Sequence, residues 1–225
     1  MYSLFSVAGG PTTPLRIETN MRIAMTGSLN APEKVLSTLS EIAFRLTSSG
    51  CLITSGFAEG AEQAAAAGAV PGRINLFLPW PKYNLHPGGP GVYIPPPEGR
   101  RERLAFEQML RGTQVISKPI WKAAMDEILL RYPSIADSFP GSRRLASRSY
   151  LQVLGEDLET PVDFLVCWAP KDDNGVKGGG RYAYEIAMSR NIPCYNIFFG
   201  EDLEALTSLI QEIENRPINS QAMER

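Results

Sequence analysis

The sequence predicts an α/β protein of Rossmann-like architecture, with a mostly parallel sheet and helices on both faces. Short apolar runs that end at glycine or serine alternate with amphipathic segments of helical period. The connections between them are short, which favours right-handed strand–helix–strand crossovers. The run VDFLVCW at 162–168 is apolar almost throughout, as expected of a central parallel strand that is covered on both faces.

The first half of the chain gives three strands and two helices. Residues 22–26 form a strand that ends at Gly27-Ser28, and Pro32 then opens an amphipathic helix that runs to about Ser49. The other elements predicted in this half are strands over 51–54 and 73–78 and a helix over about 60–67. In the last third of the chain, strands over 162–168 and 192–198 alternate with helices over about 181–190 and 202–214.

The middle of the chain departs from this alternation. Residues 79–99 are rich in proline and glycine, which predicts a long loop and no helix or central strand. Helical segments follow at about 101–111, 121–131 and 143–154. We therefore expect an N-terminal arm over 1–20 and a single domain over 21–225, with a large insertion at about 79–160.

Composition narrows the function classes. The apolar share is 44% and the net charge is −2. The three cysteines lie in apolar runs, which favours buried, reduced thiols in a cytoplasmic protein. We expect neither a membrane span nor a secretory signal. The only histidine is His86, so a Ser-His-Asp triad, a His-rich zinc site and a HExxH metalloprotease do not fit; we expect neither metal nor cofactor. Basic residues concentrated in the middle favour a local anion site over a broad nucleic-acid surface.

Three glycine-containing loops follow predicted parallel strands. Because the carboxyl ends of such strands share one edge of the sheet, and because glycine lets backbone amides approach an anion, the loops predict a phosphate site. Neither the Walker pattern nor a strict GxGxxG is present, and each glycine alone would also suit a tight turn. The candidate phosphate- or nucleotide-binding residues are Gly27, Ser28, Ser55, Gly56, Glu59, Gly60, Lys177, Gly178, Gly179, Gly180 and Arg181.

The order of these motifs resembles the Smf/DprA–LOG (SLOG) superfamily, and most of all its phage and bacterial DprA-like proteins. TSGFAEGAEQAAAAGA is similar to the family signature SGxAxGxDxxA, with Glu62 in place of the aspartate. FPGSRRLASRSYLQVLG resembles the segment that carries an Arg-Asn pair, here Arg148-Ser149, and GGGRYAYEIA takes the place of the GGT-type loop, with Gly180 for the threonine. The resemblance covers about residues 22–198 and adds Glu62 and Arg148 to the candidate site.

The resemblance implies a nucleotide-phosphate-binding protein that engages a nucleotide or single-stranded DNA, with a recombination-mediator role and a homo-oligomeric state. The location would be the cytoplasm, and the host cytoplasm if the protein is phage-encoded. The replacements at Glu62, Ser149 and Gly180 alter side chains near the expected ligand, so the ligand can differ from that of the family.

Two alternatives stay open. The LOG branch carries PGGxGTxxE, whose glutamate acts in cleavage of a nucleotide N-glycosidic bond; Glu185 falls on that position, although Arg181 and Tyr182 replace the Gly-Thr. Glu185 could equally pair with Arg181 at i,i+4. The third hypothesis is a sensor or sequestering protein that holds a nucleotide-derived signal beneath residues 79–99.

Aromatic and arginine side chains in the middle segment also have two interpretations. Trp80, Tyr83 and Tyr93 could stack on a base or anchor their loop to the core. The arginines near 100–103 and 143–144 could clamp phosphates or form solvated helix faces.

Overall fold

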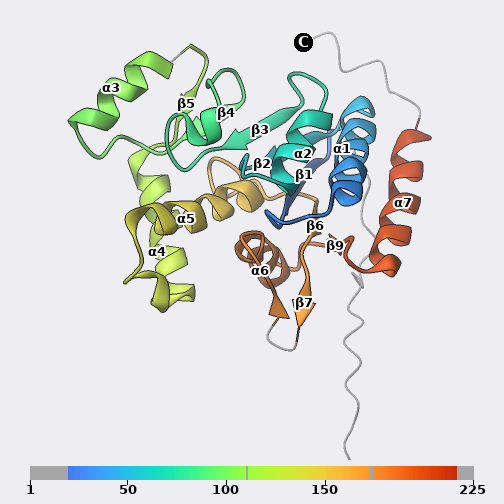
Figure 1. Cartoon of the computed structure of the whole chain (residues 1–225). Coiled ribbons are helices and arrows are strands. Elements are labelled where there is room, and N and C mark those ends of the chain that lie inside the picture. Colours follow the sequence, from blue (N-terminus) through green and yellow to red (C-terminus); the bar gives the residue numbers. More distant parts are fainter. Residues whose placement is uncertain (1–19, 110, 173–174, 217–225) are drawn as a thin grey trace, which may run out of the picture.

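The computed structural model describes residues 20–109, 111–172 and 175–216, and contains the predicted α/β fold (Figure 1). No helix within these residues is long and apolar enough to span a bilayer. The helices are α1 (Glu33–Ser48), α2 (Ala61–Gly68), α3 (Arg100–Met109), α4 (Lys118–Arg131), α5 (Pro140–Leu154), α6 (Arg181–Ser189) and α7 (Gly200–Glu214), with 3₁₀ turns at Tyr83–Leu85 and Pro133–Ile135.

Seven parallel strands form the main sheet, in the order β5-β4-β3-β2-β1-β6-β9. Strand order reverses between β1 and β6, because β2 pairs with one side of β1 and β6 with the other. In open parallel sheets, the crevice at the carboxyl end of such a switch point is where ligands bind. The strands are β1 (Arg22–Gly27), β2 (Leu52–Ser55), β3 (Ile74–Phe77), β4 (Val92–Ile94), β5 (Gln114–Val115), β6 (Phe164–Trp168) and β9 (Cys194–Asn196).

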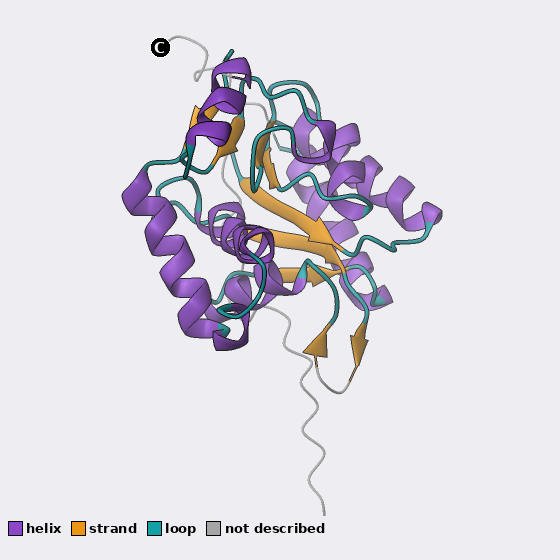
Figure 2. Cartoon of the chain, turned by 60° about the vertical axis from the view of Figure 1, so that its left-hand side comes forward, coloured by secondary structure: helices purple, strands orange, loops and turns teal. Residues whose placement is uncertain are grey.

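Helices cover both faces of the sheet, as Figure 2 shows. Neighbouring side chains of β1 face opposite core layers. Ile23 packs in the cluster that includes α1, α2 and α7, whereas Ala24 packs with α4, α5 and α6. Cys51 and Cys167 are buried in these layers, and burial raises the pKa of both thiols.

The structure corrects the prediction for the proline- and glycine-rich segment. Residues 79–99 contain β4, which pairs with β3 and β5 and so lies inside the sheet. The strand has only three residues between the flanking glycines and prolines. It forms because Val92 and Ile94 face one apolar cluster, while Tyr93 stacks on Phe77 with ring centroids 4.9 Å apart. Tyr93 therefore anchors the core and is 8% exposed.

Three further short strands were not predicted. After β6, β7 (Lys171–Asp172) and β8 (Gly175–Val176) pair as a small antiparallel sheet, and β5 forms one edge of the main sheet. Two-residue strands have too few residues to show an apolar period, so the sequence carries no signal for them. The N-terminal arm expected over 1–20 lies almost wholly outside the described residues.

Candidate functional site

The three glycine-containing loops meet at the β1/β6 switch point. Close backbone approaches bring them together: a Cβ on Gly27 would lie 2.7 Å from the Ala61 Cβ and from the Trp168 carbonyl oxygen, and one on Gly180 would lie 2.9 Å from the Gly27 Cα. Gly60 combines a φ of +77° with a space closed by the Leu29 carbonyl, 2.5 Å from where its Cβ would be. Side chains at these positions would force the loops apart.

Two helices start at this meeting point. Gly60 precedes α2 and Gly180 precedes α6, and neither helix has a side-chain cap at its N-terminus. The first amides of a helix have no intrahelical acceptor, and the helix dipole adds positive potential there. Gly178 and Gly179 are exposed at the start of α6. The Ala61 amide at the start of α2 donates to the Ser28 carbonyl at 3.3 Å, and the Arg181 amide at the start of α6 donates to the Gly178 carbonyl at 3.2 Å. The backbone donors left for a ligand are therefore the other amides at these two helix starts.

A buried carboxylate braces the site from below. Glu62 is 4% exposed, and its two oxygens accept four hydrogen bonds from three different parts of the chain. Oε1 accepts from the Thr26 hydroxyl at 3.0 Å and the Gln152 amide at 3.1 Å; Oε2 accepts from the Ala58 backbone amide at 2.8 Å and from Arg148 at 3.0 Å. Burial alone would raise the pKa of Glu62, but Arg148 and these donors together lower it.

Arg148 lies directly behind the second loop. A Cβ on Gly56 would be only 1.4 Å from its Nη1 atom, so glycine at this position makes room for the guanidinium. The group also lies over the Tyr83 ring, 5.5 Å from its centroid, and donates to the Phe77 carbonyl at 3.4 Å. Its Nε atom is buried and, among the described residues, has no hydrogen-bond partner. Arg148 thus retains one unused donor beside the loop.

The proline-rich segment is tied to the same loop. The Asn84 side-chain amide donates to the Phe57 carbonyl at 3.0 Å, and the Phe57 ring packs edge-on against His86 with centroids 4.6 Å apart. Phe57, Asn84 and Leu85 all have positive φ, which residues with a Cβ rarely adopt. Backbone strain of this kind persists only where surrounding contacts fix it, and it is frequent at functional sites.

The remaining predicted site residues lie around this centre. The Ser55 hydroxyl is buried and donates to the Met25 carbonyl at 2.8 Å, whereas the Ser28 Oγ accepts from the Asn30 amide at 3.1 Å at the half-buried start of the first loop. Glu59 and Lys177 are exposed. Within the described residues, no group of three or more acidic, histidine or cysteine side chains is placed to hold a metal ion.

Glu185 lies on the side of α6 that faces the end of α4. Its carboxylate accepts a hydrogen bond from the Tyr132 hydroxyl and lies 3.9 Å from Arg181, and its backbone carbonyl accepts from Arg131 at 2.9 Å. Burial and Glu185 both raise the pKa of Tyr132. Arg181 stacks on the Tyr182 ring, 5.0 Å from its centroid. A catalytic role for Glu185 stays a prediction.

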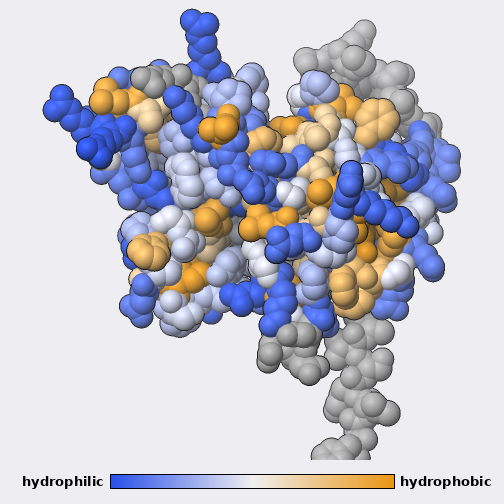
Figure 3. All heavy atoms as spheres, in the orientation of Figure 1, coloured by the Kyte–Doolittle hydropathy of each residue, from blue (hydrophilic) through white to orange (hydrophobic). Residues whose placement is uncertain are grey.

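The arginine clusters divide between two environments. Arg144 is 6% exposed and pairs with Glu98 at 2.8 Å and Glu102 at 2.9 Å, which fastens the start of α3 to α5. Arg100, Arg101 and Arg103 are exposed on α3, a region that is largely hydrophilic in Figure 3.

Sequence reasoning missed Gln152 and Asn84. Gln152 follows Arg148 by four residues, so both side chains leave α5 on one face, and this spacing was a signal that could have found it. Asn84 had no such signal, because its partner is a backbone carbonyl 27 residues away.

Fold and site together define a Rossmann-like α/β protein with three glycine-containing loops at a topological switch point. No protein-family model matches the chain, and no curated protein matches it. Among solved structures, DNA processing protein A from Helicobacter pylori, described for its single-stranded DNA binding mode, is similar at 14% identity and a TM-score of 0.36. The match covers 86% of this chain and 82% of the other.

Proposed function

We propose that the protein binds the phosphate group of a nucleotide or of single-stranded DNA at its three glycine-containing loops. One observation carries the proposal: Gly27, Gly60 and Gly180 meet at the β1/β6 switch point, where α2 and α6 begin without a side-chain cap. Backbone donors at helix N-termini are well suited to phosphate oxygens.

Each charged side chain has a separate part in this proposal. Lys177 and Arg181 flank the third loop and would supply positive charge to the ligand. Glu62 has all of its observed acceptor positions filled by protein donors, so its part is to hold the loops. Direct contact of Glu62 with a ligand stays a prediction. Arg148 is buried and held by Glu62, so its direct contact with a ligand also stays a prediction.

The test is a binding titration with an oligothymidylate and with a panel of nucleoside monophosphates, at several salt concentrations. The double variant K177Q/R181Q is expected to weaken binding of the true ligand by about tenfold or more, since hydrogen bonds to charged groups contribute about 1.5–3 kcal/mol each. The matched control K118Q/K122Q removes two exposed lysines from α4 and should bind as the parent does.

Salt dependence separates the two ligand classes. For single-stranded DNA, the logarithm of the affinity falls with the logarithm of salt by about 0.7 per neutralised phosphate, so several contacts give a steep slope. A mononucleotide makes one phosphate contact and gives a shallow slope. If neither ligand class binds, or if the control variant loses as much affinity as K177Q/R181Q, the proposal is wrong.

We extend the proposal to a recombination-mediator role on the sequence resemblance alone, with single-stranded DNA as the partner and a homo-oligomer as the active form. The N-glycosidase alternative is tested by incubating nucleoside monophosphates with the protein and with Glu185→Gln; release of free base by the parent alone would establish it. The sensor alternative predicts an intact nucleotide that co-purifies with the chain in native mass spectrometry.

A further inference from the structure

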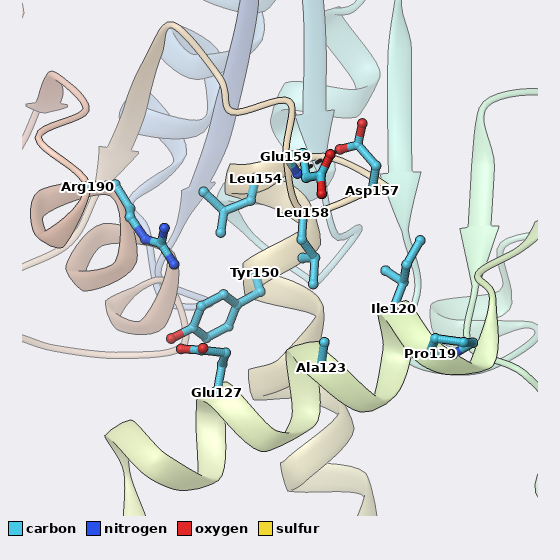
Figure 4. A pocket seen from close by; sticks show the side chains of 10 residues that line it. All are labelled: Pro119, Ile120, Ala123, Glu127, Tyr150, Leu154, Asp157, Leu158, Glu159 and Arg190. Carbon is cyan, nitrogen blue, oxygen red and sulfur yellow. Dashed lines mark hydrogen bonds between the residues drawn. The ribbon is translucent and has the colours of Figure 1, made fainter.

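A hollow lies away from the glycine-containing loops. It has a volume of about 410 Å³ and is formed by α4, the last turns of α5, the segment after α5 and Arg190 at the end of α6 (Figure 4). Both α5 and α6 lead into the next strand of the sheet, so their C-termini lie at the amino edge. The hollow is therefore on the opposite edge from the glycine-containing loops, and its size is in the usual range for small-molecule sites.

One part of this hollow is apolar. Ile120 and Ala123 from α4 face Leu154 from α5 and Leu158 from the following segment, as Figure 4 shows. Leu154 is 5% exposed, whereas Ala123 is exposed. The apolar wall of the hollow therefore extends from the core to the surface of the protein. An aliphatic or aromatic group placed here would bury apolar surface on both sides, which is the main favourable contribution to binding in such sites.

The other part is polar and carries both signs of charge. Glu127 and Arg190 point toward the Tyr150 hydroxyl from α4 and from the end of α6 (Figure 4). Burial raises the pKa of Tyr150; Glu127 raises it further, while Arg131 and Arg190 lower it, so all three charged groups act on this hydroxyl. In the described part of the chain, neither Glu127 nor Arg190 forms an ion pair, and both are exposed. Arg131, in contrast, is engaged: it hydrogen-bonds the Tyr150 hydroxyl and donates to the Glu185 carbonyl.

The two acidic residues at the far rim differ from Glu127. The Asp157 carboxylate accepts from the Glu159 and Thr160 backbone amides, both at 2.9 Å, and from the Thr160 hydroxyl at 2.6 Å. The Thr160 hydroxyl is the main cause of the lowered pKa of Asp157. Asp157 therefore shapes its own turn, and Glu159 lies exposed at the rim. Among the residues that line the hollow, the charges available to a ligand beside the Tyr150 hydroxyl are those of Glu127 and Arg190.

We propose that this hollow binds a small zwitterion with an apolar body, namely a free apolar amino acid. Its carboxylate pairs with Arg190, its ammonium group pairs with Glu127, and its side chain lies against Ala123 and Leu154. This ligand class uses the apolar wall and both unpaired charges at once, whereas an uncharged ligand would leave both charges unused. The site is independent of the proposed phosphate-binding loops and stands or fails separately.

The test is isothermal titration of the full chain with L-phenylalanine, 3-phenylpropionate and phenethylamine, which share one ring and differ in their charged groups. We expect L-phenylalanine to bind. Each analogue should bind more weakly by about tenfold or more, because each lacks one charge-assisted contact. Arg190→Gln should weaken L-phenylalanine and phenylpropionate but leave phenethylamine unchanged. Glu127→Gln should weaken L-phenylalanine and phenethylamine but leave phenylpropionate unchanged.

A bulky substitution locates the binding. Ala123→Trp fills the hollow and should abolish L-phenylalanine binding, whereas the matched control Ala205→Trp, on the exposed face of α7, should retain it. Circular dichroism of each variant verifies that it is folded. The proposal is overturned if none of the three compounds binds, if phenylpropionate binds as tightly as L-phenylalanine, or if the folded Ala123→Trp variant binds like the parent.

Discussion

The buried brace beneath the loops gives the sharpest prediction about stability. Glu62→Gln keeps the shape of the side chain but removes its charge, and it turns an amide toward the donors of Ala58 and Arg148. Removing one partner of a buried ion pair costs about 3–5 kcal/mol, because the other charge stays buried and unpaired. Arg148 is 5% exposed and has few ways to regain water, so we expect a loss in this range in urea unfolding.

A double-mutant cycle separates the ion pair from general damage. Arg148→Met removes the partner, and in Glu62→Gln/Arg148→Met no buried charge of the pair is left. The double variant should be more stable than the sum of the two single losses predicts, by about 1–3 kcal/mol. Glu107→Gln, on an exposed residue, is the control and should change stability by less than about 0.5 kcal/mol. A loss below about 1 kcal/mol for Glu62→Gln, or additive single losses, would refute the reasoning.

Three further predictions follow from the same contacts. Because the folded protein lowers the pKa of Glu62, the ionised carboxylate stabilises the fold fully above the pKa that it has in the unfolded chain, and this stabilisation is lost as the pH falls through the folded pKa. The parent should therefore lose more stability on acidification than Glu62→Gln does, measured by urea unfolding at a series of pH values. Gly56→Ala places a methyl group on the Arg148 guanidinium and should lower stability by about 1–3 kcal/mol and weaken ligand binding, whereas Gly99→Ala, with open space around it, should do neither. Asn84→Ala releases the Phe57 carbonyl and should make the 79–99 segment more sensitive to limited proteolysis, at a stability cost of about 1 kcal/mol; unchanged cleavage would contradict the tether.

The parallel core of the fold was predictable because each strand has a strong local signal. Residues 162–168 are apolar on both faces, and the strands that end at Gly27 and Ser55 lead into helices of clear amphipathic period. These signals give the α/β class and the edge at which the loops lie. They do not give strand order, which depends on packing between distant segments.

The strand inside the proline-rich segment was not predictable from local pattern. Prolines argue against a central strand because they lack a backbone donor. In β4 the prolines stop just outside the three residues that pair, and the stacking of Tyr93 on Phe77 stabilises the strand through a contact that no sequence window contains. Short strands of this kind are fixed by tertiary contacts.

The candidate site was predictable in its glycines and only partly in its side chains. The three loops were located from strand ends, and the resemblance drew attention to Glu62 and Arg148. What the sequence did not contain was the pairing of these two residues, since they are 86 positions apart. The buried brace is a tertiary feature, although the spacing of Arg148 and Gln152 on α5 is compatible with it.

The brace also bears on where attraction for an anion would arise. Glu62 cancels much of the charge of Arg148, so the pair adds little net positive potential at the three loops. A buried ion pair is a weak source of stability compared with an apolar pair of similar size. Its four hydrogen bonds, however, connect the end of β1, the loop after β2 and helix α5. Such a brace holds backbone amides in place before a ligand arrives, which lowers the ordering cost of binding. Attraction for phosphate would then come from the helix N-termini, Lys177 and Arg181. For that reason K177Q/R181Q should weaken binding at a smaller cost in stability than Glu62→Gln, which should lower both.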